Sequence, residues 1–240
     1  MNSTIDLLKG HASIRKFDLE HKITDEEMQA MFDASRQAST WMNGEFYSII
    51  HIKDPAKKEE VYNHSPEVMR FIKNNNELVV FVGDMHRTHL ASQMHDREYH
   101  ANGIEPLLMA TVDASLAAQN FLVAAESLGY GGVMIGMIRD QAKEIAQVLE
   151  LPERTIPLFA IAIGKPAQKM YVKPRLQHEL VVHTDTYKAP TVEQLKEYDD
   201  IQTEFAGPRQ TKTWTQKFAS YFSRPQKTNS EELMKENGLL

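Results

Sequence analysis

The sequence predicts a layered α/β or α+β fold in which helices cover both faces of one central sheet. Three observations support this. Four β-rich runs alternate with longer segments that carry helical signals, as in a sheet covered by helices. One run, Leu78–Val82, is apolar without alternation, which indicates a strand buried on both faces. The longest helical segment, residues 104–128, is apolar nearly all round and should be central.

The expected helices each carry a start signal, a stop signal or an apolar helical pattern. Gly10 is a natural stop for the first helix. Thr24 and Glu27, three residues apart, form a capping box. Pro55 suits the first position of a helix, and Asp140 is expected to cap another. The expected helices are residues 4–9, 24–37, a segment from 54 onward, 104–128, 140–149, 191–204, 213–222 and 230–236.

The expected strands are rich in β-branched and aromatic residues, and they are residues 46–53, 78–82, 131–137 and 156–163. Small residues recur along the 104–128 helix and allow another helix to approach closely. That helix face is either a dimer seam or ordinary core packing. The same helix contains Glu105, Asp113 and Glu126, so we expect a soluble core helix rather than a membrane span.

The composition is that of a globular protein and narrows the function. The 240 residues are 42% hydrophobic and 25% charged, with a formal charge of −6, which argues against a general nucleic-acid binder. The absence of cysteine excludes thiol catalysis, iron–sulfur clusters and thiolate zinc sites. It also fits a reducing cytoplasm. No apolar run of signal-peptide length follows the N-terminus, so we expect a cytoplasmic protein without a membrane anchor.

Two short clusters could bind a phosphate. His11, Ser13 and Arg15 occupy alternate positions, so in an extended chain their side chains point the same way. A donor, a hydroxyl and a cation on one side suit an anion, although an ordinary surface loop has the same composition. Lys173 and Arg175 flank a proline and would also share one side. The two clusters could converge on one phosphate.

Motifs for other chemistries are weak or missing. The glycines of residues 129–136 follow a helix and enter a strand, the reverse of the dinucleotide-binding order. His86 and His89 lie three apart on a probable helix, and His95 and His100 follow. Because no pair of acidic ligands stands with them, no metal site is expected.

One set of short motifs extends along nearly the whole chain. The motifs are His11–Phe17, Ala38–Thr40, Val112–Ala114, Ala117–Asn120, Ala124–Val133, Pro157–Phe159, Gly164–Ala167 and Lys173–Leu176. Their order and spacings resemble the FMN-dependent nitroreductase superfamily, most closely its NADPH-dependent nitroreductase and flavin-reductase group. The resemblance implies an α+β fold with a central mixed sheet. It implies a flavin-binding core over residues 1–190 and a helical C-terminal extension over 191–240 that wraps a partner in a homodimer.

The resemblance also implies a residue set for the FMN site. His11 and Ser13 would hold the phosphate with Lys173 and Arg175, and Ala12 would contribute backbone. Arg15 would lie near the N1 and C2 carbonyl edge of the ring, where a cation stabilises the reduced flavin. The residues that would contact the ring through backbone, or from the neighbouring subunit, are Tyr130, Gly131, Gly132, Ser39 and Thr40.

Three stretches depart from the family pattern. Trp41, Met42 and Asn43 replace smaller residues beside the acceptor pocket, although Trp41 could instead fill the core. Either Glu67 or Met69 falls where a glutamine usually contacts flavin. A shortened basic loop retains Arg209 and Lys212 as candidates for the extra phosphate of NADPH, unless they only form a solvated surface.

The implied activity is an FMN-dependent oxidoreductase that uses NADPH or NADH. It would reduce nitroaromatics, quinones or free flavin by ping-pong hydride transfer, with the chemistry carried by the cofactor. An alternative is a flavin-binding redox sensor or carrier with little turnover. A third hypothesis is a nucleic-acid or partner-binding tail, because residues 205–240 hold six Lys or Arg against three Glu.

Overall fold

The computed structural model describes residues 2–209 and 211–240 and divides the chain into two compact units. The first unit extends to Met170 and also contains Thr228–Leu240, and the second is Tyr171–Lys227. The boundary expected after residue 190 lies within the second unit.

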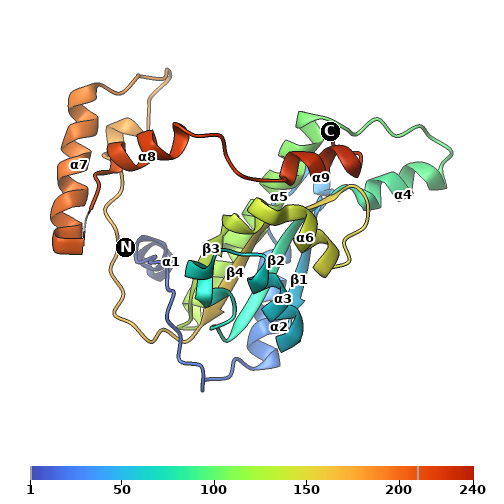
Figure 1. Ribbon diagram of the computed structural model, residues 1–240, viewed down its shortest axis with the longest axis horizontal. Helices are drawn as coiled ribbons and strands as arrows, with labels where there is room; N and C mark the ends of the chain where they lie inside the picture. The colour runs from blue at the N-terminus through green and yellow to red at the C-terminus, as the bar shows by residue number, and fades with distance from the viewer. Residues whose placement is uncertain (1, 210) are drawn as a thin grey trace. The chain divides into compact units, whose positions relative to one another are not determined.

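The first unit is built on a sheet of four strands in the order β1-β2-β4-β3 (Figure 1). Among the described residues each neighbouring pair is antiparallel, so the expected mixed sheet is wrong. The connections from β1 to β2 and from β3 to β4 leave and re-enter the sheet at the same end, as Ile52 opposite Leu78 shows. The connection from β2 to β3 instead crosses to the other end of the sheet. A helix between strands also occurs in parallel crossovers, so the sequence could not separate the two. The strands are β1 (Tyr47–Ile52), β2 (Glu77–Asp84), β3 (Gly131–Ile135) and β4 (Thr155–Gly164).

The helices lie close to the expected positions. Thr24 and Glu27 form the expected capping box, and Pro55 follows the N-cap Asp54. Thr191 and Thr213 begin two C-terminal helices with capping boxes of their own. The helices are α1 (Ser3–Lys9), α2 (Asp25–Arg36), α3 (Pro55–Asn63), α4 (His86–Met94), α5 (Ile104–Ser127), α6 (Ala142–Val148), α7 (Val192–Ala206), α8 (Trp214–Phe222) and α9 (Ser230–Glu236).

The segment after β3 differs from expectation. The strand stops at Ile135, and Gly136–Gln141 form a 3-10 helix. Asp140 does not cap α6, whose N-cap is Gln141. Arg139 explains the change, because its guanidinium donates to the carbonyl of Leu158 and ties the segment to β4. Such a tertiary contact overrides a local capping signal.

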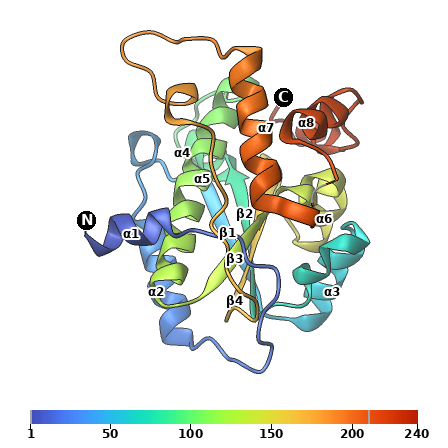
Figure 2. The same ribbon diagram turned by 90° about the vertical axis from the view of Figure 1, so that its left-hand side faces the viewer.

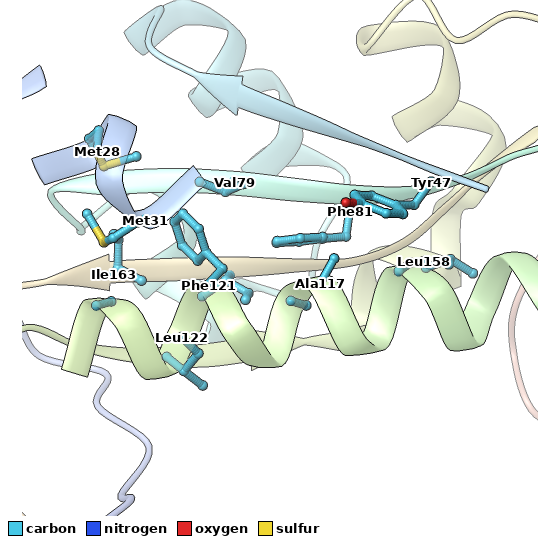
Figure 3. Close-up of a cluster of buried hydrophobic side chains, with 14 of the residues drawn as sticks. Met28, Met31, Tyr47, Val79, Phe81, Ala117, Phe121, Leu122, Leu158 and Ile163 are labelled. Carbon is cyan, nitrogen blue, oxygen red and sulfur yellow. The ribbon is translucent and has the colours of Figure 1, made fainter. Parts of the chain in front are cut away.

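Helices cover both faces of the sheet, α2 and α5 on one side and α3 and α6 on the other (Figure 2). Alternate residues of β2 serve the two faces: Val79 and Phe81 face α5, and Leu78 and Val80 face away. Figure 3 shows Phe81 and Phe121 together between the sheet and α5. Burying side chains of this size stabilises the fold by about 1.5–3 kcal/mol each.

The α5 helix is long and apolar enough to cross a membrane by length and composition alone. However, Phe121, Leu122 and Ala117 are buried in the cluster that packs against the sheet (Figure 3). The buried Asp113 also lies within the helix. We therefore interpret α5 as the expected core helix.

The last residues of the chain return to the first unit. Ser230 donates through Oγ to the carbonyl of Arg139 at 2.9 Å. Lys143 pairs with Glu236 at 2.7 Å, and the side chain of Leu239 is buried in the core. These contacts anchor α9 against the sheet and α6.

The second unit is held by polar contacts and by aromatic rings that pack edge to face or tilted. Asp199 accepts the backbone N–H of Thr215 at 2.9 Å and also the Thr215 hydroxyl. Burial alone would raise the pKa of Asp199, but these hydrogen bonds lower it overall. The rings of Tyr198, Trp214 and Phe218 follow one another at centroid distances of 5.7 and 4.9 Å. The pair of helices α7 and α8 is thus fixed at one end.

Candidate functional site

The connector, residues 11–17, runs beside β3 and is held there by backbone hydrogen bonds. Ile14 donates its N–H to the carbonyl of Gly132 at 2.9 Å, and the carbonyl of Lys16 accepts the N–H of Ala167 at 2.9 Å. A Cβ on Gly131 would lie 2.5 Å from Cγ1 of Ile14. Glycine is therefore required at 131 for the connector to approach this closely.

The side chains of the connector alternate as the sequence predicts. Ala12 and Ile14 are buried in the protein, while His11, Ser13 and Arg15 remain accessible. Nδ1 of His11 lies 2.6 Å from Oε1 of Glu126, whose side chain is only 6% exposed. This contact fixes the imidazole and leaves Nε2 as its second polar atom for a ligand. No binding role was predicted for Glu126, whose only signal in the sequence is an acid near the end of an apolar helix.

A cavity of about 420 Å³ opens between the connector and β3. Arg15 lines it together with Met69, Phe71 and the β3 residues 133–135. The guanidinium of Arg15 lies 6.0 Å from the ring centroid of Phe71. Mostly apolar walls with the cations Arg15 and Lys16 suit a flat ring that gains negative charge at one edge, so the cavity fits the FMN that the resemblance implies.

The structure separates the two alternatives for the residue near the flavin. Met69 lines the cavity. Glu67 instead pairs with Arg70 at 2.8 Å, and its side chain is 81% exposed. Of these two residues, Met69 is therefore the better candidate for a contact with the flavin. The assignment of Glu67 to the flavin stays a prediction.

Tyr130, Gly131 and Gly132 are placed by packing at the start of β3. A Cβ on Gly132 would lie 2.9 Å from both Ile163 and Leu122. The Tyr130 hydroxyl lies 3.3 Å from Nε2 of His21. Burial and the neighbouring Glu27 carboxylate raise the pKa of Tyr130 to about 12, so its phenol is neutral at ordinary pH. The side chain anchors the backbone that borders the connector.

A second cavity of about 420 Å³ lies on the outer side of α5. Ser39, Thr40 and Trp41 line it from one side, and helix residues such as Met109 line it from the other. Along this side the helix exposes apolar side chains at every fourth position, and three of them also line the cavity. These residues, which we call the α5 stripe, are Ile104, Leu108, Val112 and Leu116.

The Trp41 loop, residues 41–45, is held by one buried acid. Oδ1 of Asp113 accepts the Trp41 N–H at 3.0 Å, and Oδ2 accepts the Phe46 N–H at 3.1 Å. Asp113 is 1% exposed. Met42 and Glu45 adopt positive φ angles of 48° and 50°, which cost on the order of 1 kcal/mol each. The loop shape therefore depends on Asp113, a role that the sequence analysis missed.

The first three side chains of the Trp41 loop are exposed. Trp41 is 51% exposed and Met42 is 87% exposed. The alternative in which Trp41 fills the core is thus wrong. Asn43 also has a positive φ, of 59°. Their predicted contact with an electron acceptor is untested.

The remaining candidates belong to the second unit. The carbonyl of Pro174 accepts the Tyr198 hydroxyl at 3.3 Å and Nε2 of Gln202 at 3.0 Å, which ties the Lys173–Arg175 segment to α7. The guanidinium of Arg209 donates to the carbonyls of Ala206 and Phe205 at the end of α7. Lys212 is exposed. The convergence of Lys173 and Arg175 with the connector stays a prediction.

Comparison with known families covers almost the whole chain. The profile described as "Nitroreductase family" matches residues 8–165. A second profile, "Nitroreductase family, C-terminal domain", matches residues 173–240.

Curated relatives agree with these profiles over their full length. An "NADPH-dependent oxidoreductase" of Staphylococcus saprophyticus is 35% identical, with 98% of this chain and 97% of the relative covered. An "FMN reductase (NADPH)" of Bacillus subtilis is 33% identical, with coverage of 99% and 98%. The solved structure of an NADPH:FMN oxidoreductase from Vibrio harveyi, complexed with NAD+, has a TM-score of 0.90 and 30% identity, with coverage of 99% and 98%.

Proposed function

The chain belongs to the nitroreductase family, and on this premise we propose that it is an FMN-dependent oxidoreductase driven by NADPH or NADH. Its substrates are small electron-poor aromatic compounds such as nitroaromatics, quinones or free flavin. The observation that carries the proposal is the cavity beside β3, where Arg15 faces apolar walls. Relatives named for NADPH and FMN, aligned over the full chain, support the same activity.

The residues of the connector bind and orient the cofactor. The His11 imidazole and the hydroxyl of Ser13 contact the phosphate, and the backbone at Ala12 lies between them. Arg15 places its positive charge at the ring edge, where it favours the reduced form. Bound FMN would supply the hydride transfer between the nicotinamide and the acceptor. The Glu126 carboxylate keeps the His11 ring in the orientation that leaves Nε2 free for the phosphate.

Backbone groups complete the ring site. Tyr130, Gly131 and Gly132 present main chain without bulky side chains toward the ring, which suits close approach of a flat group. Glu67 or Met69 closes the opposite side, and only Met69 lines the cavity. Lys173 and Arg175 contribute the remaining charge on the phosphate. Arg209 and Lys212 bind the extra phosphate of NADPH.

The α5 stripe supports a homodimer. Four apolar side chains at helical spacing would be covered by a second copy of the chain, which is the usual fate of such a patch. Ser39 and Thr40 line the cavity beside the stripe, so they would reach the flavin ring of the neighbouring subunit. The helical segment after residue 190 wraps the partner. We place this soluble dimer in the cytoplasm, in keeping with the absence of cysteine.

The purified protein tests this proposal directly. We expect a yellow protein whose flavin absorbance bleaches on addition of NADPH and returns on addition of a quinone or a nitrofuran. Steady-state initial rates should give parallel lines in double-reciprocal plots, because nicotinamide and acceptor use one site in turn. A yellow protein that NADPH does not bleach would favour a flavin sensor or carrier. A colourless protein that does not take up added FMN would refute flavin binding altogether.

A further inference from the structure

The end of β2 and the start of β4 bring two segments together at one edge of the first unit. Asp84 pairs with Thr155 in the antiparallel register of β2 and β4. The chain therefore enters α4 beside the turn that precedes β4. Met85 donates its N–H to the carbonyl of Arg154 at 3.0 Å and locks the two segments together.

This arrangement places three metal-ligating side chains next to one another. His86 and His89 lie three residues apart on the first turn of α4, so they share one helix face. Glu153 comes from the turn before β4. One ligand atom from each residue lies within 4.8 Å of the other two. The sequence showed the two histidines, and the fold supplies the acid.

The histidine nitrogens of the cluster are available to a ligand. Nδ1 of His86 is buried and has no hydrogen-bond partner among the described residues. Nδ1 of His89 lies 3.1 Å from Oε1 of Glu153, but the contact is not aligned as a hydrogen bond within the described chain. A buried nitrogen without a partner is costly, and a cation would satisfy both imidazoles at once.

We propose that His86, His89 and Glu153 bind one divalent cation of the zinc class. Zinc takes imidazole nitrogen and carboxylate oxygen at about 2.0–2.2 Å, so ligand atoms in a tetrahedral site lie about 3.4 Å apart. The His89–Glu153 contact already meets this spacing. The His86 ligand atom lies within 4.8 Å of the other two, so the bound ion would draw it closer. Two imidazoles select zinc, copper, nickel or cobalt over magnesium or calcium.

Neighbouring residues orient His89 without taking up the proposed ligand positions. Nε2 of His89 lies 3.4 Å from Nε2 of Gln93, and the His89 ring packs 5.1 Å from the ring of Tyr99. These contacts orient the imidazole, as outer-shell groups do at metal sites. The guanidinium of Arg154 lies over the Tyr99 ring at 4.8 Å and donates to the carbonyl of Gly238. The Arg154 guanidinium therefore contacts groups other than the three proposed ligands.

The Glu153 side chain is 56% exposed and that of His89 is 17% exposed, so a cation can enter from solvent. Three protein ligands leave a fourth position for water. The ion would tie the start of α4 to the turn before β4. The flavin cavity is lined by other residues, so zinc binding and the proposed reductase activity can fail independently.

Isothermal titration calorimetry tests the site on the tag-free protein as purified, treated with EDTA and then freed of it. We expect Zn²⁺ to bind at one equivalent per chain with micromolar affinity or tighter, and Mg²⁺ not to compete. Glu153→Gln keeps the size of an exposed side chain and should weaken Zn²⁺ binding about tenfold or more. The double variant H86Q/H89Q should abolish saturable binding.

A matched control uses the neighbouring histidines. His95 is exposed after α4, and His100 pairs with the exposed Glu98 at 3.2 Å, so H95Q/H100Q should bind Zn²⁺ like the original protein. Zn²⁺ should also raise the thermal midpoint of the original protein and of this control, but not of H86Q/H89Q. Absence of Zn²⁺ binding, or binding that E153Q and H86Q/H89Q leave unchanged, would overturn the proposal.

Discussion

The connector, which we propose binds the cofactor, and the Trp41 loop, which we propose borders the acceptor pocket, both depend on α5 but in different ways. Each is held by one buried acid of α5, the connector by Glu126 and the loop by Asp113. Glu126 contacts a side chain, the imidazole of His11. Asp113 instead accepts two backbone N–H groups and so sets the path of the loop itself.

The two regions also differ in how many contacts fix them. The connector is extended and forms backbone hydrogen bonds to both Gly132 and Ala167. The loop includes non-glycine residues with positive φ angles, and Trp41 and Met42 face solvent. The connector, proposed for the cofactor, is therefore held in place along its length. The Trp41 loop, proposed for the acceptor, can change its side chains without disturbing the core.

Removing the Asp113 carboxylate should give the largest effect. Asp113→Ala leaves the N–H groups of Trp41 and Phe46 without their acceptor, and we expect the free energy of unfolding to fall by about 2–3 kcal/mol. Urea denaturation followed by circular dichroism measures this. Asp113→Asn keeps the shape and one acceptor oxygen, so it should lose about half as much. A D113A variant whose free energy of unfolding stays within about 0.5 kcal/mol of the original protein would mean that the loop does not depend on this acid.

Arg175→Ala tests whether the connector shares the phosphate with the second unit. A charge-assisted hydrogen bond to a phosphate is worth about 1.5–3 kcal/mol, so the dissociation constant for FMN should rise about tenfold or more. Quenching of FMN fluorescence in a titration gives this constant. Arg175→Lys keeps the charge and should lose less. Unchanged FMN affinity in the alanine variant would remove Arg175 from the site and leave the connector to bind the phosphate alone.

Trp41→Ala should have the smallest effect on stability, and it isolates the loop. Because the indole is half exposed, the free energy of unfolding should change by no more than about 0.5 kcal/mol. FMN affinity should stay the same, while the ratio of kcat/KM for a bulky and a small quinone should change. A strong loss of FMN binding in W41A would contradict the proposal that the connector binds FMN while the Trp41 loop contacts only the acceptor.

Much of the fold could be predicted from local signals. The Thr24–Glu27 capping box, Pro55 after Asp54 and the apolar run of β2 all produced the expected elements. Strand direction could not be predicted, because helical connections occur in both parallel and antiparallel sheets. The end of β3 was also missed, since the contact of Arg139 with Leu158 joins residues far apart in sequence.

The candidate site was predictable where its residues are adjacent in sequence. Alternation in the extended connector correctly placed His11, Ser13 and Arg15 on its accessible side. Residues that act through tertiary contacts gave no local signal: Glu126 and Asp113 read as isolated acids in an apolar helix. Glu153 likewise became a candidate ligand only because β2 and β4 pair in one particular register.

The most direct test of the account is a crystal structure of the protein with FMN bound. We expect the flavin ring in the cavity between Arg15 and β3, with its phosphate on His11 and Ser13. Ser39 and Thr40 of a second copy should approach the ring across the α5 stripe. Flavin density elsewhere on the molecule, with the connector and the cavity beside β3 empty, would contradict the central claim.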